Sequence, residues 1–574
     1  MANYYSSDKA TQIVVALLKA HNIRYVIASP GTTNIALVGS MQYDPYFKIY
    51  SSADERSAAY MACGLAAETG EPVVITCTEA TASRNYLPAL TEAYYRKLPI
   101  LVITGHHGLA KIGHLSSQTI DRSVHPNDTV KLSVSVNTIH TPEDEWRTIV
   151  DVNRAILELS HHGNGPVHIN LEAGVSAGFH QKELPKFRKI KRVTDKQNMP
   201  LMPQGRAAVF IGSHVTFSKR EVNAIDQFCS SHDAVVFCDH TSGYKGRYRV
   251  NSALIACQHN YHSELLNIDL LIHIGEVSGD TYTTGRLQPK AVWRVSPDGE
   301  LRDTFHQLRY VFEMDEADFF NYYTKEGTKT DNNLQLCQNE YAAIMSQIPE
   351  LPFSNIWVAK ELHAELPANA VVHFSIFNSL RSWNFFQLPD SIESSCNVGG
   401  FGIDGPLSTL IGASLAKTDL LHYMIAGDLA FFYDLNSLGN RHIKNNLRIL
   451  LVNNGRGIEF RKLDHPGSKF GEDADLFFAA AGHYGNKSPN LVRHYAEDLG
   501  FNYMHASNKK EFEKCMDAFV APSLSEKPII LEVFTQTEDE VKALNTIRNL
   551  KKDVKTVLKT TVKHAVNNVK DIIK

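Results

Sequence analysis

Residues 423–428 read Tyr-Met-Ile-Ala-Gly-Asp, and residues 449–454 read Ile-Leu-Leu-Val-Asn-Asn. Each segment is an apolar run of the length of a buried strand, and each ends in a turn. The chain between them has room for a helical crossover, which would make the two strands parallel and bring their ends to one edge of a sheet. Because ligands bind at that edge, we predict that Asp428 and Asn454 converge there.

The same alternation of strand, turn and helix continues outward from this segment in both directions. It occupies three blocks, and strands that alternate with helices are typical of parallel sheets covered on both faces. Two polar stretches without clear periodicity, residues 187–202 and 325–339, are interpreted as linkers. We therefore predict three α/β domains and a C-terminal helix, over residues 1–185, 200–330, 350–545 and 550–574.

The composition is that of a large globular protein. The chain has 574 residues, of which 43% are hydrophobic and 21% charged, and its net charge of −4 gives no reason to expect a nucleic-acid partner. No uncharged apolar run is long enough to span a membrane, and residues 1–20 lack the apolar core of an export signal. The eight cysteines are scattered without a Cys-x-x-Cys motif, which favours buried thiols in a reducing cytoplasm.

The last residues differ in charge from the rest of the chain. Residues 541–574 contain nine lysines and arginines against two aspartates, and apolar residues recur there at helical spacing. A basic amphipathic helix of this kind can lie on an anionic membrane surface. We favour the plainer interpretation, a docked helix with a solvated lysine face.

The predicted strand ends carry ligands that suit a magnesium ion. The carboxylate of Asp428, the amide oxygen of Asn454 and a nearby backbone carbonyl are hard oxygen donors, and Mg²⁺ takes about six of them, often including phosphate oxygens. The alternative is that both segments are ordinary turns that end strands. The pair of motifs at this spacing favours the metal.

A Gly-Asp-x segment followed by Asn-Asn resembles the diphosphate motif of the thiamin-diphosphate (ThDP) enzyme superfamily. The resemblance implies that Asp428, Asn454 and the backbone carbonyl of Arg456 hold Mg²⁺ on the cofactor's diphosphate. Leu429 departs from the family's usual third glycine without removing a ligand.

A second segment, residues 53–66, resembles the part of the same family that binds the aminopyrimidine ring. By this match Glu55 is the carboxylate that hydrogen-bonds the ring, favours its imino tautomer and so promotes removal of the thiazolium C2 proton. The alternative is a glutamate placed at a helix start by the helix dipole. Because further landmarks match in order, the resemblance implies pyrimidine, middle and diphosphate domains, and a homodimer or homotetramer with the cofactor between subunits.

Within the superfamily the pattern resembles most the menaquinone-pathway synthases. This match implies that Ile403 bends the cofactor, that Ser379 contacts its diphosphate, and that Gln118 lies in the active site. The segments that carry it also place further residues at the cofactor, namely Gly402, Gly427, Leu429 and Ala430.

The substrate positions depart from those synthases. Several of their arginines are matched here by Thr33, His107, Trp383 and Val398, and neutral side chains cannot replace bidentate carboxylate donors. We therefore expect a different substrate. Arg381 and Arg456 are near the predicted site and are candidates to receive an anion.

A histidine pair points to a related chemistry. His106 and His107 resemble the pair that relays protons in pyruvate-decarboxylase-like members, and imidazole suits that task because its pKa lies near working pH. Glu459 lies just past the metal loop, where such decarboxylases also carry a glutamate. The alternatives are that the two histidines are adjacent by chance and that Glu459 is an exposed glutamate of a loop. The middle block shows no convincing glycine fingerprint for FAD.

Taken together, these features predict a ThDP- and Mg²⁺-dependent lyase or transferase. It would decarboxylate a 2-oxo acid and pass the acyl-anion equivalent to an aldehyde or ketone acceptor. Simple decarboxylation to an aldehyde is the alternative, and a non-catalytic ThDP-binding scaffold or regulatory subunit is the rival from another class.

Overall fold

The computed structural model describes residues 4–172, 178–194, 196–325, 330–462, 465–482 and 488–553. The chain divides into two compact units, which are described separately. Unit 1 comprises Met1–Met199 with Gly299–Glu313, and unit 2 comprises Pro200–Asp298 with Met314–Lys574.

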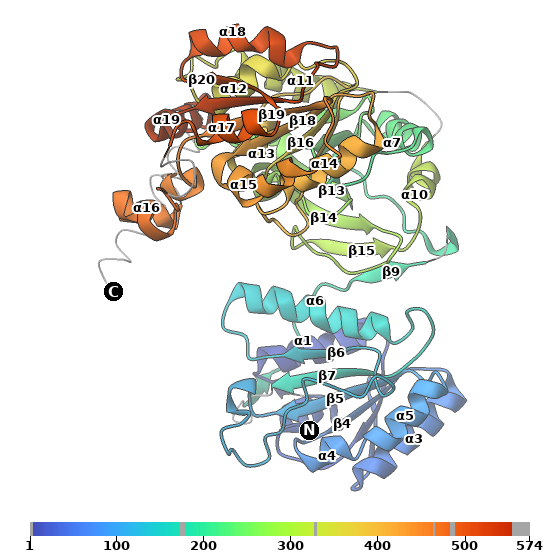
Figure 1. The fold of residues 1–574 in the computed structure, drawn as a ribbon. Coiled ribbons are helices and arrows are strands. Elements are labelled where there is room, and N and C mark those ends of the chain that lie inside the picture. Colours follow the sequence, from blue (N-terminus) through green and yellow to red (C-terminus); the bar gives the residue numbers. More distant parts are fainter. Residues whose placement is uncertain are drawn as a thin grey trace. The chain divides into compact units, whose positions relative to one another are not determined.

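Unit 1 is built on a six-stranded parallel sheet in the order β3-β2-β4-β5-β7-β6. Helices α1 and α6 pack on one face and α3 and α5 on the other, each over its own apolar core (Figure 1). The elements of unit 1 are β1 (Tyr5–Ser6), α1 (Lys9–Ala20), β2 (Tyr25–Ala28), α2 (Ile35–Met41), β3 (Lys48–Ser51), α3 (Glu55–Thr69), β4 (Val73–Cys77), α4 (Thr81–Arg84), α5 (Leu87–Tyr95), β5 (Ile100–His106), β6 (Ser133–Val136), α6 (Pro142–Glu158), β7 (Val167–Glu172), β8 (Phe179–Gln181), β9 (Lys191–Val193) and β15 (Leu308–Phe312).

The first half of unit 2 contains five parallel strands in the order β12-β11-β10-β13-β14. Its elements are β10 (Ala207–Ile211), α7 (Lys219–His232), β11 (Val235–Cys238), β12 (Arg249–Asn251), α8 (Ala253–Ala256), β13 (Asn267–Ile274), α9 (Thr281–Arg286), β14 (Gln288–Val295), α10 (Glu316–Tyr323) and α11 (Asn332–Met345).

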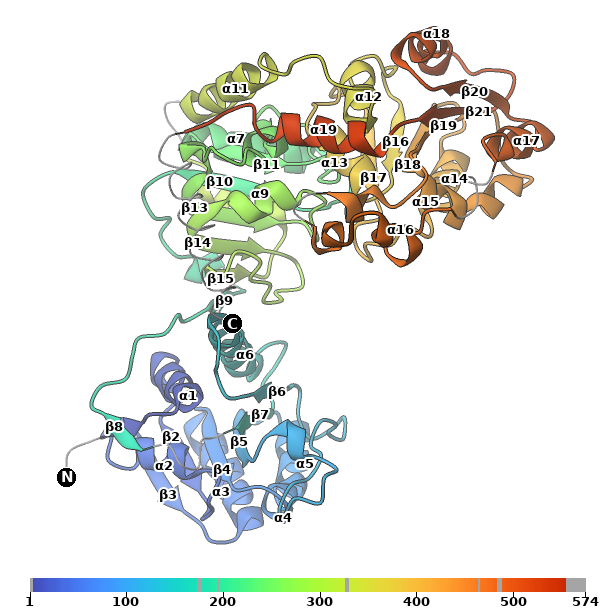
Figure 2. The ribbon, with the colours of Figure 1, turned by 90° about the vertical axis from the view of Figure 1, so that its left-hand side faces the viewer.

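The second half of unit 2 is another six-stranded parallel sheet, in the order β17-β16-β18-β19-β21-β20. Apolar cores lie on both of its faces, one of them beneath α12 and α19 and the other beneath α14 and α17 (Figure 2). Its elements are α12 (Asn355–Leu362), β16 (Val371–Phe374), α13 (Asn378–Asn384), β17 (Glu393–Cys396), α14 (Pro406–Ala416), β18 (His422–Gly427), α15 (Asp428–Tyr433), β19 (Leu447–Asn453), α16 (Ala474–Phe477), α17 (Leu491–Asp498), β20 (Asn502–Ala506), α18 (Lys509–Val520), β21 (Ile529–Phe534) and α19 (Thr537–Ile547).

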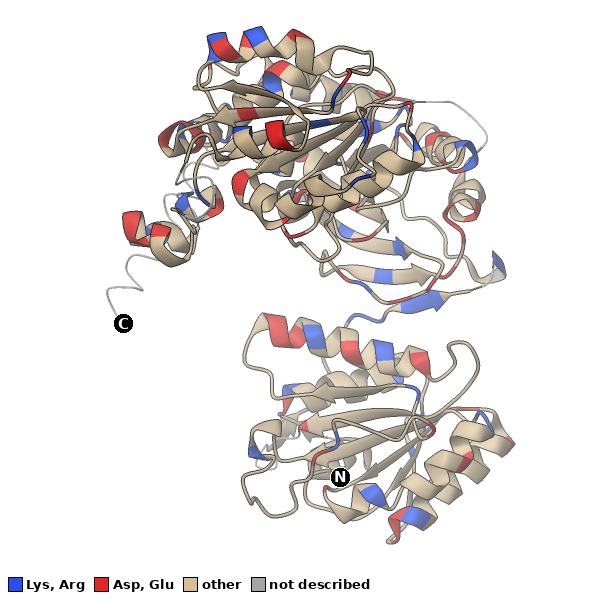
Figure 3. Cartoon of the chain, in the orientation of Figure 1, with Lys and Arg blue, Asp and Glu red and all other residues tan. Residues whose placement is uncertain are grey.

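Burial on both faces explains the composition of these strands. Every residue of β5 and β19 is buried, and Figure 3 shows the charged residues mainly on helices and loops. In the described residues no helix is long and apolar enough to cross a membrane. The predicted fold class, consecutive parallel-sheet α/β domains of the ThDP-enzyme type, is confirmed.

The structure differs from the predicted domain boundaries in two places, and a third prediction falls on residues outside the described ranges. Residues 299–313 group with unit 1, where β15 pairs with β9. The second predicted linker is wrong from Asn332 onward, because α11 begins there and buries Leu334, Cys337 and Ile344. From residue 554 on, the basic helix expected over residues 550–574 lies outside the described residues.

Candidate active site

The two motifs that predicted the fold lie at the ends of adjacent strands. In the register of β18 and β19, Gly427 faces Val452, so that Asp428 and Asn454 follow the carboxyl ends of neighbouring parallel strands. Asp428 is only 4% exposed, and its carboxylate accepts hydrogen bonds from the backbone N–H of Leu429 (2.7 Å) and of Gly455 (2.6 Å).

The surroundings of Asp428 fit a bound cation. Burial raises the pKa of its carboxyl to about 7, although backbone N–H groups oppose the shift. The Oδ1 atom of Asn454 is buried and has no hydrogen-bond partner in the described part of the chain. A buried carboxylate and an unpartnered amide oxygen at the ends of adjacent strands are both costly without a cation, so both donors suit Mg²⁺.

Leu429 is accommodated by a glycine in the facing loop. A Cβ atom built on Gly457 would lie 3.2 Å from Leu429 Cδ1 and from Phe460 Cδ2, so the leucine packs closely against this glycine. The departure from the family's glycine therefore leaves the metal donors in place. The side chain of Arg456 forms an ion pair with Asp475 (2.7 Å).

The other predicted cofactor residues of unit 2 follow neighbouring strands at the same edge. Ser379 is buried in α13, which follows β16, and Gly402 and Ile403 lie in the loop after β17. Ile403 packs against the apolar core of the sheet, and Ala430 is buried in α15. Four adjacent strands thus contribute to one edge.

Glu459 and Arg381 form an ion pair at this edge. Arg381 donates to both carboxylate oxygens of Glu459 (2.8 and 3.2 Å), and Lys462 donates to one of them (2.9 Å). Burial raises the pKa of Glu459, but the two cations outweigh it and hold the pKa below its usual value. The pair lines a cavity of about 150 Å³ together with Phe377, Phe401 and Tyr282.

In unit 1, Glu55 is the first residue of α3. The helix begins there because Asp54 caps it, accepting a hydrogen bond from the backbone N–H of Arg56 (3.1 Å). The Glu55 carboxylate is half-buried and accepts a hydrogen bond from Asn85 Nδ2 (3.2 Å). It follows β3, at the ligand edge of the unit 1 sheet.

The histidine pair lies at the end of β5, at the same edge of unit 1. Burial lowers the pKa of His106 to about 4, so the imidazole is neutral near pH 7. Its Nδ1 accepts a hydrogen bond from the Gly108 N–H (3.0 Å), which places its proton on Nε2, an atom with no partner among the described residues. The backbone N–H of His107 donates to the buried carboxylate of Glu79 (2.8 Å).

The loop after β5 holds a guanidinium that the sequence analysis missed. Arg122 is buried and donates to Gly105 O (2.9 Å) and Asn170 Oδ1 (2.7 Å), whereas its Nε and Nη1 have no partner among the described residues. No pattern of residue spacing in the sequence identifies Arg122 as a site residue. Gln118, in the same loop, is exposed at a backbone φ of 61°.

The positions that replace the expected arginines are mostly inaccessible. Trp383 and Val398 belong to a core cluster of unit 2, and Thr33 is buried and hydrogen-bonded to Thr78 (2.9 Å). Three of the four positions are therefore packed in the protein rather than exposed to a soluble substrate.

Comparison with known proteins identifies the family. Residues 8–125 match the model of the thiamine pyrophosphate enzyme N-terminal TPP binding domain. A 2-succinyl-5-enolpyruvyl-6-hydroxy-3-cyclohexene-1-carboxylate synthase of Bacteroides fragilis is 33% identical over 565 residues, which cover 94% of this chain and 98% of the relative. The chain belongs to the thiamin-diphosphate-dependent enzyme family. A synthase of the same name from Flavobacterium johnsoniae is 28% identical, over 93% of this chain and 97% of the relative.

Membership of the ThDP-dependent family bears on the predicted chemistry. It confirms the predicted family and its likeness to the menaquinone-pathway synthases, and it supports ThDP as the cofactor. The individual site residues, including Glu55, His107 and Gln118, remain predictions that the geometry accommodates.

Proposed function

We propose that the protein binds ThDP with Mg²⁺, decarboxylates a 2-oxo acid and transfers the resulting acyl-anion equivalent to an acceptor carbonyl. The observation that carries this proposal is that the buried Asp428 carboxylate and the unpartnered Asn454 oxygen follow adjacent strands, at the edge where a diphosphate-bound cation would need them. ThDP, when bound, supplies the nucleophilic carbon and the electron sink. The protein supplies the carboxylate at Glu55 and the metal donors.

The substrate carboxylate has two candidate partners. Arg381 faces a cavity of about 150 Å³, and Arg122 has two buried N–H groups without acceptors among the described residues. Guanidinium groups bind carboxylates bidentately, which suits a 2-oxo acid. In this proposal the substrate carboxylate replaces Glu459 as the partner of Arg381, and Glu459 stays ionised because it remains paired with Lys462.

Simple decarboxylation is the second candidate. It requires acids that protonate the intermediate, for which His106 and Glu459 are the predicted groups. His106 is neutral near pH 7, and Glu459 stays ionised beside Lys462 after the substrate takes its place at Arg381, so neither is an effective proton donor to the intermediate. This difference favours transfer to an acceptor.

The test is product analysis by NMR with purified protein, ThDP, Mg²⁺ and a panel of 2-oxo acids. We expect a new carbon–carbon bond only when an aldehyde or ketone acceptor is present. An aldehyde formed without acceptor would establish the decarboxylase instead. No consumption with ThDP demonstrably bound, across a panel that includes 2-oxoglutarate, would favour the non-catalytic scaffold.

The role of Arg381 leads to a separate prediction. Arg381→Met should raise the KM for the 2-oxo acid about 30-fold, because a charge-assisted hydrogen bond to a carboxylate is worth roughly 2 kcal/mol. Affinity for ThDP should stay unchanged. Steady-state kinetics measure the effect, with Arg493→Met, in an exposed ion pair of α17, as the matched control. An unchanged KM in the Arg381 variant would assign the pair a structural role.

A further inference from the structure

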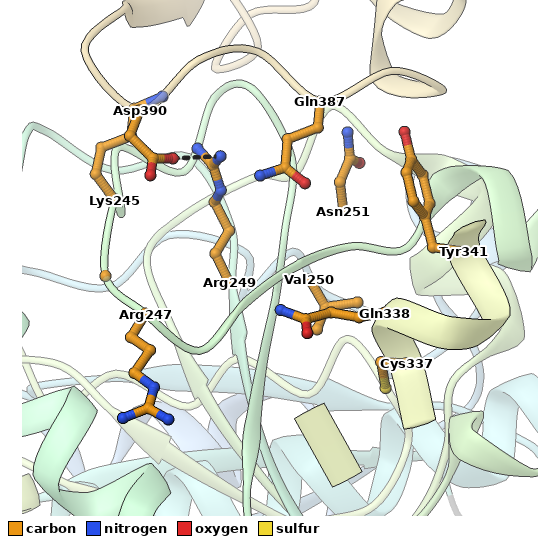
Figure 4. Close-up of a pocket in the computed structure, with 11 residues that line it drawn as sticks. Lys245, Arg247, Arg249, Val250, Asn251, Cys337, Gln338, Tyr341, Gln387 and Asp390 are labelled. Atoms are coloured by element: carbon orange, nitrogen blue, oxygen red, sulfur yellow. Dashed lines mark ion pairs between the residues drawn. The ribbon is translucent and has the colours of Figure 1, made fainter. Parts of the chain in front are cut away.

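A pocket of about 340 Å³ in unit 2 shares no lining residue with the Asp428 edge. It lies between the segment Lys245–Asn251, helix α11 and the loop after α13 (Figure 4). Its volume is at the lower end of the roughly 300–1,000 Å³ of ligand sites, so it suits a compact molecule.

Three cations line this pocket, and two of them are neutralised. Arg249 forms an ion pair with Asp390 (2.6 Å), drawn as a dashed line in Figure 4, and Arg247 forms one with Asp331. The ammonium of Lys245 has no hydrogen bond or ion pair to any residue that the structure describes. Burial, together with the charge of Arg249, lowers the pKa of Lys245 to about 8.

Neutral polar groups in the same pocket also lack partners. Asn251 is 7% exposed, and its Nδ2 donates to Phe386 O (3.2 Å), but its Oδ1 accepts nothing from the described residues. Gln338 and Gln387 also line the cavity, and their side chains are exposed and available to a ligand. Buried polar groups are normally satisfied, so the unpartnered Asn251 oxygen, in a cavity that Lys245 also lines, indicates a complementary ligand.

We propose that this pocket binds a small organic acid as a second ligand site. Its carboxylate would pair with Lys245, and a hydroxyl or ammonium group on the same molecule would donate to Asn251 Oδ1. One unpaired cation matches a single negative charge better than the two charges of a phosphate. The ligand class is therefore a hydroxy acid or an amino acid.

The pocket can be tested by titrating the full-length protein, with ThDP and Mg²⁺, with lactate, serine and glutamate in calorimetry and saturation-transfer NMR. Acetate, which lacks the donor, and inorganic phosphate serve as comparisons. We expect at least one of the three acids to bind more tightly than both comparisons. Lys245→Met should weaken that binding at least tenfold, and Gln387→Leu should weaken it severalfold.

Matched controls separate this pocket from the active site. Lys219→Met removes an exposed lysine of α7 and should leave binding unchanged, as should Asp428→Ala, which affects the other site. Equal binding by the Lys245→Met protein would overturn the proposal. Phosphate as the tightest ligand, or no binding of any acid up to about 10 mM, would overturn it too.

A stability measurement gives an independent readout. Lys245 is partly buried, and the partial loss of hydration of its ammonium destabilises the ligand-free protein, so Lys245→Met should raise the melting temperature by about 2 °C. The variant should also lose the further rise that the bound acid produces in the original protein. A persisting ligand-induced rise in the variant would contradict the proposed role of Lys245.

Discussion

Glu55→Gln should lower turnover about 10³-fold while leaving the affinity for ThDP and Mg²⁺ within about threefold, as expected for loss of a general acid–base group. The amide has the size of the carboxylate and keeps an oxygen for the Asn85 hydrogen bond, so α3 should begin at the same place. It lacks the negative charge that, by the family resemblance, favours the reactive tautomer of the aminopyrimidine ring. Steady-state kinetics and calorimetric titration with ThDP measure the two quantities.

The matched control for this variant is Glu68→Gln. Glu68 lies near the other end of the same helix and is exposed, so its replacement should leave turnover unchanged. Near-original turnover in the Glu55 variant would remove Glu55 from the mechanism. A parallel loss of cofactor affinity would instead make it a binding residue.

Asp428→Ala should weaken the binding of ThDP with Mg²⁺ by about 100-fold or more, because it deletes a charged ligand of the cation. Activity should disappear at ordinary cofactor concentrations. Asp428→Asn serves as a second variant, since it keeps an acceptor for the N–H groups of Leu429 and Gly455 while it removes the charge. If both Asp428 variants fold and bind ThDP with Mg²⁺ as tightly as the original protein does, the assignment of Asp428 to the metal is wrong.

Asp419→Ala is the control for this second prediction. Asp419 is exposed in the loop that precedes β18, so its loss removes one acidic charge without touching the edge of the sheet. Cofactor affinity should be unchanged. Circular dichroism of all variants separates loss of the cation site from loss of the fold.

The two variants together test the expectation, drawn from the family resemblance, that two subunits share one cofactor site. Glu55 belongs to unit 1 and Asp428 to unit 2, and the family resemblance places the cofactor between subunits. A mixed dimer of Glu55→Gln and Asp428→Ala subunits would then contain one intact site, so random mixing should restore about one quarter of the original activity. No recovery from a mixture of demonstrably exchanged subunits would assign both residues to one chain's own site.

The sequence predicted the ends of β18 and β19 better than it predicted the loop after β5. Asp428 and Asn454 could be paired in advance because parallel strands deliver their carboxyl ends to one edge, whatever the side chains around them. Arg122 was not predicted because nothing in the sequence of a polar loop indicates which side chain is buried. Trp383 was matched to an arginine by its position, but the packing of the sheet buries it in a core.

The amino-acid sequence by itself determined the alternation of apolar strands and amphipathic helices, the parallel sheets that follow from it, and the strand ends at which Asp428, Asn454 and Glu55 stand. These properties depend on local periodicity and on the handedness of crossovers, both of which act over a few tens of residues. Only the tertiary structure decided that Glu459 is neutralised by Arg381, and that Lys245 remains unpaired among otherwise paired cations. The first outcome depends on the distance between two residues that are 78 positions apart in the chain, and the second depends on which carboxylates reach the pocket. The periodicity of the sequence carries no information about either.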